Sequence, residues 1–311
     1  MNILGKRYWL FALSFLLIVP GLVILFTLGV PKAIDFTGGT LLELSFSTGV
    51  VPSTEEVTGV YSDLGITDIQ VQTLGEDSLT IRSSTLNTNS STDQISAIQE
   101  ALAAISGGDV IVNRSDTVTP AISQQVTTRA TQAVSVAALA VIIYITISFR
   151  KVPNSFRYGI CAIIAMAHDV LIVFSLVAIG GQLFGFQVDS LFLTALLTVI
   201  GFSVQDKIVV FDRIRENTPI LRKISYEKLV NHSIVQTLQR SINTQLMTVE
   251  FLLLALALFG GITLREFSII LLVGLLSGTY SSIFIAAPLL VVWETKEWKN
   301  WFRKPKTNQA A

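Results

Sequence analysis

The stretch WLFALSFLLIVPGLVILFTL (Trp9–Leu28) runs for 20 residues without a charged side chain. A helix rises about 1.5 Å per residue, so about 20 apolar residues cross the roughly 30 Å hydrocarbon core of a membrane. The segment is longer than the apolar core of a secretory signal, and it runs into Gly29-Val30-Pro31 without a small-residue cleavage site. We therefore predict a retained transmembrane helix here.

The composition of the whole chain points the same way. Of its 311 residues, 51% are hydrophobic and 14% are charged, and the mean hydropathy is +0.62. Soluble domains carry about 25% charged residues, so a soluble enzyme is excluded. The 22 basic residues balance 22 acidic ones, which excludes a nucleic-acid binder. One cysteine cannot make an internal disulfide, and two histidines leave little for a metal site. We also expect no cofactor and no enzymatic activity.

Five further spans are predicted in the second half of the chain, and the fourth and fifth of the resulting six each contain charged residues. The five are Thr127–Phe149, Phe156–Ile179, Val188–Phe211, Thr237–Phe259 and Phe267–Trp293. The fold class is therefore a polytopic helical membrane protein with six transmembrane helices. An even number of spans places both termini on the same side.

The basic residues predict the orientation. With the N-terminus inside, 16 of the 22 lysines and arginines lie in inner segments. Because cytoplasmic loops carry the excess of Lys and Arg, we expect both termini in the cytoplasm. The chain then divides into a first transmembrane helix (1–30), an extracytoplasmic domain (31–125), a five-helix transmembrane domain (126–294) and a basic cytoplasmic tail (295–311).

The extracytoplasmic domain has a pattern of alternating strands and helices. Apolar residues alternate at Leu42, Leu44 and Phe46, and a capping box follows at Ser53–Glu56. Two short apolar runs around residues 69–81 suggest a hairpin, a second helix opens near residue 91, and a last strand ends the unit near residue 112. This order, β-α-β-β-α-β, predicts an α+β ferredoxin-like domain. The domain holds no catalytic constellation, which favours a binding or moving part.

Asp206 and Lys207 interrupt the fourth span about five residues from its inner end. A charge at mid-span costs at least about 2.5–3.5 kcal/mol, so each one needs an explanation. Either Asp206 exchanges protons in a low dielectric, or both groups extend to the inner interface as structural charges. Because successive residues are about 100° apart on a helix, the two side chains should face different ways.

Three other positions carry ionisable groups within or beside spans. Arg240, near the start of the fifth span, would lie at the depth of Asp206, as a proton switch or as a static ion pair. Glu250, about 15 Å further along, could extend a proton path or stay protonated in the interior. His168-Asp169 in the third span could be a proton relay, or a polar pair that joins neighbouring helices.

Several long blocks resemble the SecD/SecF family of the resistance-nodulation-division (RND) superfamily. The blocks are GFSVQDKIVVFDRIREN (Gly201–Asn217), NHSIVQTLQRSINT (Asn231–Thr244), IDFTGGTLLEL (Ile34–Leu44), His168-Asp169 and FGGITLREFSIILLVGLLSGTYSSI (Phe259–Ile283). They occur in the family's order, and the resemblance extends over essentially the whole chain. The sequence departs from the family pattern at Gln205-Asp206-Lys207, where the residue after the aspartate is usually small or hydroxylated, and at Glu250.

The resemblance implies an accessory subunit of SecF type that pairs with SecD beside the SecYEG channel, in the lipid of the bacterial inner membrane. Such a subunit uses protons as the coupling ion to promote export of preproteins. The family's transmembrane carboxylate and arginine correspond to Asp206 and Arg240. The turn of Asp35, Phe36, Thr37, Gly38 and Gly39 would be the conformational joint between membrane and outer domain, where the glycines permit positive φ. Two alternatives are an RND-type proton-coupled exporter of lipids or small molecules, and a passive scaffold.

Overall fold

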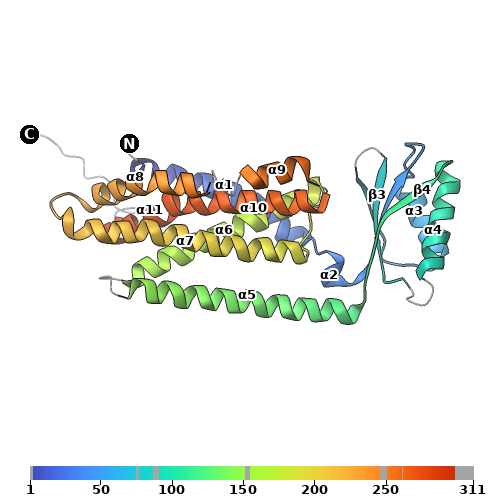
Figure 1. Cartoon of the computed structure of the whole chain (residues 1–311), viewed down its shortest axis with the longest axis horizontal. Helices are drawn as coiled ribbons and strands as arrows, with labels where there is room; N and C mark the ends of the chain where they lie inside the picture. Colours follow the sequence, from blue (N-terminus) through green and yellow to red (C-terminus); the bar gives the residue numbers. More distant parts are fainter. Residues whose placement is uncertain are drawn as a thin grey trace, which may run out of the picture. The chain divides into compact units, whose positions relative to one another are not determined.

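The computed structural model describes residues 3–74, 77–86, 91–150, 155–245, 251–260 and 262–297. The chain forms two compact units. We call them the helical unit (Met1–Val30, Val134–Phe186 and Leu191–Ala311) and the sheet unit (Pro31–Ala133 and Gln187–Ser190). Figure 1 shows both, coloured along the sequence. Two long helices, α5 and α7, each contribute residues to both units.

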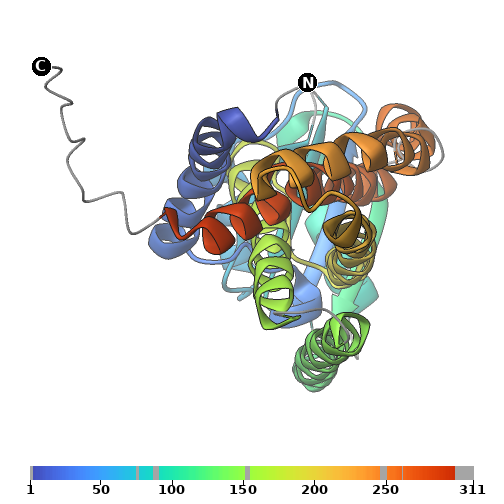
Figure 2. The same cartoon turned by 90° about the vertical axis from the view of Figure 1, so that its left-hand side faces the viewer.

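The helical unit contains α1, most of α5, and all later helices apart from the first residue of α7. Their bounds are η1 Leu4–Lys6, α1 Arg7–Leu28, α5 Pro120–Phe149, α6 Ser155–Leu183, α7 Ser190–Ile220, α8 Tyr226–Gln245, α9 Phe251–Phe259, α10 Ile262–Ser281, the π-helical turn η3 Ser282–Ala286 and α11 Ala287–Thr295. Of these, α6 contacts α1, α10 and α11 (Figure 2).

Within the described residues, five helices are long and apolar enough to cross a membrane. They are Leu4–Leu28, Pro120–Phe149, Ser155–Leu183, Ser190–Ile220 and Leu264–Thr295. The predicted span 237–259 covers the end of α8 and all of α9, and residues 246–250 between them lie outside the described part of the chain. Helix α5 starts at Pro120, before the predicted span 127–149, and helix α7 ends at Ile220, after the predicted span 188–211. A span predicted from hydropathy reports the apolar part of a helix, whereas backbone hydrogen bonding continues into polar sequence.

Close approach of small residues and stacked aromatic rings hold the helical unit together. A Cβ added at Gly21 of α1 would lie 2.1 Å from Ser175 Oγ of α6, so only glycine fits there. The rings of Phe149, Tyr158 and Phe211 join α5, α6 and α7, with centroids 5.3–5.8 Å apart. Such contacts are how helices associate where water supplies no driving force.

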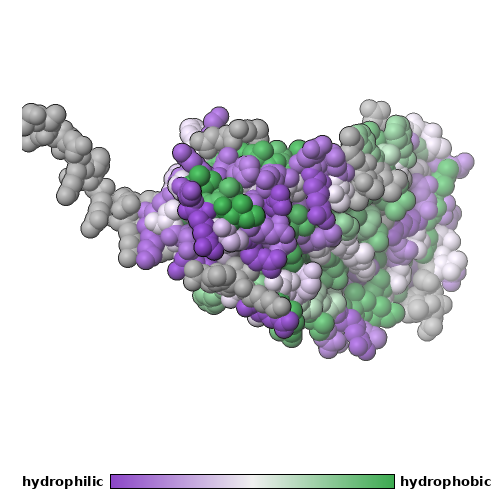
Figure 3. Space-filling model, turned by 60° about the vertical axis from the view of Figure 1, so that its left-hand side comes forward, coloured by the Kyte–Doolittle hydropathy of each residue, from purple (hydrophilic) through white to green (hydrophobic). Residues whose placement is uncertain are grey.

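The surface of the helical unit is apolar along its helices and polar where α7 turns into α8. Large side chains such as Trp9 and Phe26 are 81% and 87% exposed, as expected for groups that face lipid. Figure 3 shows hydrophilic residues gathered at the end of the unit, where the turn after α7 carries the exposed Arg222 and Lys223.

The sheet unit is a four-stranded antiparallel sheet with strand order β2-β3-β1-β4. Its elements are α2 Ile34–Thr37, β1 Gly39–Phe46, α3 Thr54–Asp63, β2 Gln70–Leu74, β3 Ser78–Ser83, α4 Ser91–Ser106 and β4 Val110–Val118. Alternating residues of β1, namely Leu42, Leu44 and Phe46, form a core with α3 and α4 (Figure 1). Helix α3 begins at the predicted capping box, in which Ser53 and Glu56 bond each other's backbone N–H.

Candidate functional site

Two carboxylates are buried inside the helical unit on neighbouring helices. Asp169 of α6 is 1% exposed and Asp206 of α7 is 6% exposed. Lys207, the next residue of α7, is completely buried. A buried charge is tolerated only when it is paired and hydrogen-bonded, so the partners of these three residues determine what each can do.

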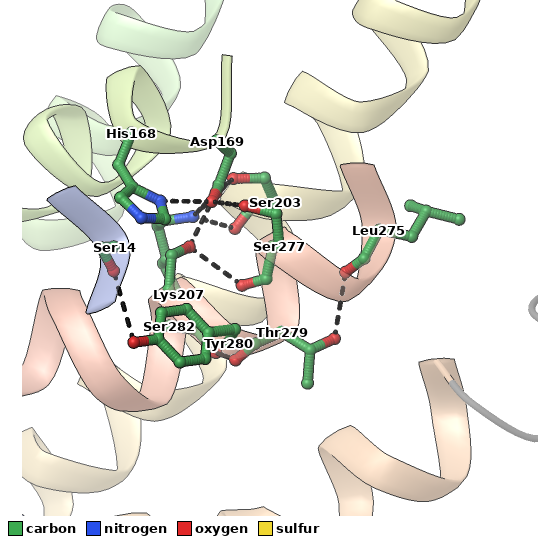
Figure 4. Close-up of polar contacts among 12 residues, drawn as sticks. Ser14, His168, Asp169, Ser203, Lys207, Leu275, Ser277, Thr279, Tyr280 and Ser282 are labelled. Atoms are coloured by element: carbon green, nitrogen blue, oxygen red, sulfur yellow. Dashed lines mark hydrogen bonds and ion pairs between the residues drawn. The ribbon is translucent and has the colours of Figure 1, made fainter. Parts of the chain in front are cut away.

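Asp169 is surrounded by five donors, one from its own helix α6 and two each from α7 and α10 (Figure 4). Its Oδ2 accepts from Lys207 Nζ at 2.7 Å and from Ser203 Oγ at 2.6 Å. The hydroxyl groups of Ser277 and Ser281, one turn apart on α10, donate to Oδ1 and Oδ2, each at 2.7 Å. The carboxylate therefore ties α6 to α7 and α10.

The ammonium of Lys207 points into the bundle and not to the membrane interface. Besides Asp169 it donates to the carbonyl oxygen of Ser203 at 3.2 Å and to the hydroxyl of the same residue. The interpretation that Lys207 extends to the inner interface is therefore wrong. Chain neighbours on α7 face different elements, as the 100° step of a helix requires, and Lys207 meets α6 while Asp206 meets α8 and η3.

His168 lies beside Asp169, with Nδ1 at 3.0 Å from Asp169 Oδ1. Its other ring nitrogen, Nε2, is buried and has no hydrogen-bond partner among the described residues. The ring of Tyr280 stacks on the imidazole at 6.2 Å, and the Tyr280 hydroxyl donates to the carbonyl of Leu10 at 2.9 Å. The predicted pair of His168 and Asp169 is thus in direct contact.

Asp206 has a different environment, because neutral hydroxyl groups donate its hydrogen bonds within the described part of the chain. Ser241 of α8 donates to Oδ1 at 2.9 Å, and Ser282 of the π-helical turn η3 donates to Oδ2 at 2.7 Å. Within the described chain Asp206 makes no ion pair. A π-helical turn inside an α-helix is rare and is frequently found at functional sites.

Arg240 does not form the predicted ion pair with Asp206. Its side chain is exposed, although its charge and that of Lys207 both act on Asp206 through space. Arg240 directly precedes Ser241 on α8, so its chain neighbour is the residue that donates a hydrogen bond to Asp206. Glu250, the other predicted member of a proton path, lies outside the described residues.

The hydroxyl groups that complete the two sites were not predicted from the sequence. These are Ser203, Ser241, Ser277, Ser281 and Ser282. Serine is common in transmembrane helices, so a single serine carries little information. A usable signal was the spacing of Ser277 and Ser281, which places two hydroxyls on one face of an otherwise apolar span.

The segment Asp35–Gly39 forms the short helix α2 and the first residue of β1. Gly38 and Gly39 have φ of +75° and +123°, which is the region that favours glycine. The carboxylate of Asp35 accepts hydrogen bonds from the backbone N–H of Ser190 at 2.9 Å and from its hydroxyl. This segment therefore contacts the first residue of α7.

Two family models match the chain. The model described as protein export membrane protein SecD/SecF, C-terminal, matches residues 97–296, and that of the SecD/SecF GG motif matches residues 23–50. The chain belongs to the SecD/SecF family. It is thus an accessory subunit of the Sec protein translocase and a multi-pass inner-membrane protein.

Named relatives agree with this assignment and not with an exporter of lipids or small molecules. The protein translocase subunit SecF of Anaerolinea thermophila is 63% identical over 305 residues, which cover 98% of this chain and 97% of the relative. That of Thermobaculum terrenum is 43% identical over 320 residues, with 100% and 99% covered. The crystal structure of SecDF from Thermus thermophilus matches with a TM-score of 0.79 and 32% identity, and covers 95% of this SecD/SecF family member but only 39% of the SecDF chain.

Proposed function

We propose that this subunit couples protein export to proton movement, and that Asp206 is the group that takes up and releases the proton. The observation that carries the proposal is the contrast between the two buried carboxylates. Asp169 has a cation at 2.7 Å, whereas Asp206 has two neutral hydroxyl groups. A proton carrier must be tolerated both charged and neutral, and only the second environment meets that condition.

The ion pair of Asp169 and Lys207 serves as a fixed tie in this proposal. Removing the charge of Asp169 would leave a buried ammonium without a counter-ion, which is strongly unfavourable. His168 and three serine hydroxyl groups hold the carboxylate in place from α6, α7 and α10. The pair therefore keeps these helices together while Asp206 changes its charge.

Protonation of Asp206 would change the contacts of α7 with α8 and η3. As a carboxylate it accepts from Ser241 and Ser282, whereas a protonated carboxyl group donates one hydrogen bond and needs an acceptor. One serine hydroxyl must then rotate or separate. Arg240, next to Ser241, would favour the ionised form of Asp206 when α8 is close. When α8 withdraws, that preference would be lost and Asp206 could take up a proton.

The arrangement in the membrane follows from the same proposal. We place six spans, the sixth formed by residues 237–259, with both termini in the cytoplasm and the sheet unit outside. The strand order of the sheet unit and the alternation of its elements support a ferredoxin-like domain. The partner is SecD, since a relative from Thermus thermophilus is a single SecDF chain of which this subunit covers 39%. The SecYEG channel and the exported preprotein complete the assembly.

The test is the Asp206→Asn substitution in cells that hold no other copy of this subunit. Asparagine keeps the size and one acceptor but cannot take up a proton. We expect normal amounts of the variant in membranes by immunoblot, accumulation of a reporter precursor, and no further loss when an uncoupler is added. The matched control is Asp212→Asn, six residues along α7, where the carboxylate is partly exposed and pairs with Arg215. Normal export by the Asp206 variant would refute the proposal.

A further inference from the structure

The side chain of Asp35, four residues before the start of β1, binds Ser190, the first residue of α7. The backbone N–H of Ser190 donates to Asp35 Oδ2 at 2.9 Å, and the Ser190 hydroxyl donates to the same oxygen. A carboxylate at a helix N-terminus satisfies an unpaired N–H group and interacts favourably with the helix dipole. Asp35 is therefore a cap for α7, supplied from 155 residues earlier in the chain.

Backbone hydrogen bonds reinforce this contact. Val188 N–H donates to the carbonyl of Pro31 at 2.7 Å, and Ala33 N–H donates to the carbonyl of Val188 at 2.9 Å. Lys32 and Val188 are paired as a parallel bridge, with the side chains of Ala33 and Val188 buried. The strand-like pairing continues directly into the Asp35 contact. We call residues 31–39 and 187–190 together the α7 clamp.

The α7 clamp is part of the sheet unit. Helix α2 contacts β1 and β4, and the side chain of Ile34 is buried. A Cβ added at Gly39 would lie 2.5 Å from the carbonyl oxygen of Ser83 on β3, so the backbone meets the sheet without a gap. Residues 187–190 group with the sheet unit, although α7 continues into the helical unit.

From these contacts we propose that Asp35 is a positioning residue that fixes the start of α7 to the sheet unit, so that displacement of α7 at Asp206 moves the sheet unit directly. Asp206 lies 16 residues beyond Ser190 on the same helix, about 24 Å along its axis. A continuous helix transmits a shift of that site to its own first residue. Asp35–Gly39 then holds the first residue of α7 rigidly within the sheet unit.

Bending between α1 and the sheet unit is assigned to Gly29 and Val30. The boundary between the units falls directly after Val30. Gly29 has φ of +82°, a backbone conformation that favours glycine, and a Cβ added to it would meet nothing within 4 Å. This part of the inference rests on the proposed proton-driven movement, whereas the clamp itself does not.

A disulfide across the α7 clamp tests whether the clamp must open during export. The substitutions Lys32→Cys and Val188→Cys join bridge partners, whose spacing suits a disulfide. They are made in a chain whose single cysteine is removed by Cys161→Ala, and the two single-cysteine chains are the controls. We expect the disulfide to form and export to be equal in the oxidised and reduced states. A block of export in the oxidised state that a reductant reverses would overturn the proposal.

Substitutions of the cap test whether Asp35 does the positioning. Asp35→Ala removes the acceptor, and we expect the equilibrium constant for disulfide formation by the same cysteine pair, measured against glutathione, to fall about fivefold. Asp35→Asn keeps an acceptor oxygen and should keep most of that constant. Export should follow the same order, with equal membrane levels. An unchanged constant in Asp35→Ala would overturn the proposal.

The two readouts separate this inference from the proton proposal. Disulfide formation depends on the clamp alone, so Asp206→Asn should leave it unchanged even where export is lost. If Asp206→Asn keeps normal export while Asp35→Ala lowers both disulfide formation and export, the proton proposal fails and the clamp stands. If Asp206→Asn loses export while Asp35→Ala changes neither readout, the clamp fails and the proton proposal stands.

Discussion

Substitution of Lys207 by methionine measures the buried ion pair directly. Methionine is unbranched and of similar length, so it removes the ammonium with little change in volume. It leaves the carboxylate of Asp169, 1% exposed, without the cation at 2.7 Å. Removing one partner of a buried pair typically costs about 3–5 kcal/mol of unfolding free energy.

The magnitude should lie at the lower end of that range. Four of the five donors to Asp169 remain in the variant, from His168 and from three serines. Each hydrogen bond to a charged group contributes roughly 1.5–3 kcal/mol, so the carboxylate keeps much of its stabilisation. We expect Lys207→Met to cost about 3 kcal/mol. In the double variant Asp169→Asn/Lys207→Met no buried charge is left, and about 2 kcal/mol should return.

The assay is equilibrium unfolding of the purified chain in mixed micelles with increasing dodecyl sulfate, followed by far-ultraviolet circular dichroism. A double-mutant cycle over Asp169 and Lys207 isolates the pairwise energy from the two single changes. The matched control is Arg213→Met on the same helix, which breaks a half-exposed pair with Glu216 and should cost at most about 1 kcal/mol. The reasoning is refuted if Lys207→Met costs no more than this control, or if the double variant is no more stable than the single one.

Three further predictions concern the sheet unit in the full chain. Ser53→Ala removes the cap of α3 and should destabilise that helix by about 1 kcal/mol, seen as faster hydrogen exchange; unchanged exchange would contradict the assigned cap. Hydrogen bonds from Ser53 lower the pKa of Glu56 below its ordinary value of 4.5. The stabilisation of α3 by this carboxylate is therefore complete above about pH 4.5 and is lost as pH falls through the folded-state pKa. Hydrogen exchange of α3, corrected for its intrinsic rate, should rise between about pH 5 and pH 3, and a flat profile would contradict the prediction. Gly39→Ala at φ +123°, against the Ser83 carbonyl, should cost about 1–3 kcal/mol in thermal unfolding, and an equal melting temperature would contradict the tight fit.

Local patterns in the sequence were sufficient for the elements that depend on neighbours in the chain. Trp9–Leu28 lies within the first candidate span, because twenty apolar side chains need a helix to satisfy their backbone in lipid. Ser53 and Glu56 form the predicted capping box, since that motif involves only residues three apart. The charged residues in spans were also recognised as unusual, because burial of a charge is costly whatever its partner.

The partners of those charges depended on the tertiary structure. From the sequence, Lys207 was discussed as a neighbour of Asp206, and Arg240 as its counter-ion. In the fold, Lys207 bonds Asp169, 38 residues away, and Asp206 bonds Ser241 and Ser282. Helix geometry turns adjacent side chains about 100° apart, so the helix that packs on each face selects the partner.

The amino-acid sequence was therefore enough to predict which charged residues lie within the spans, that the chain crosses a membrane, and its likeness to the SecD/SecF family. The packing of the helices was needed to show that one buried carboxylate, Asp169, is neutralised by a lysine while the other, Asp206, is held by hydroxyl groups. The physical reason is that ion pairs and hydrogen bonds act over about 3 Å in space, irrespective of separation along the chain.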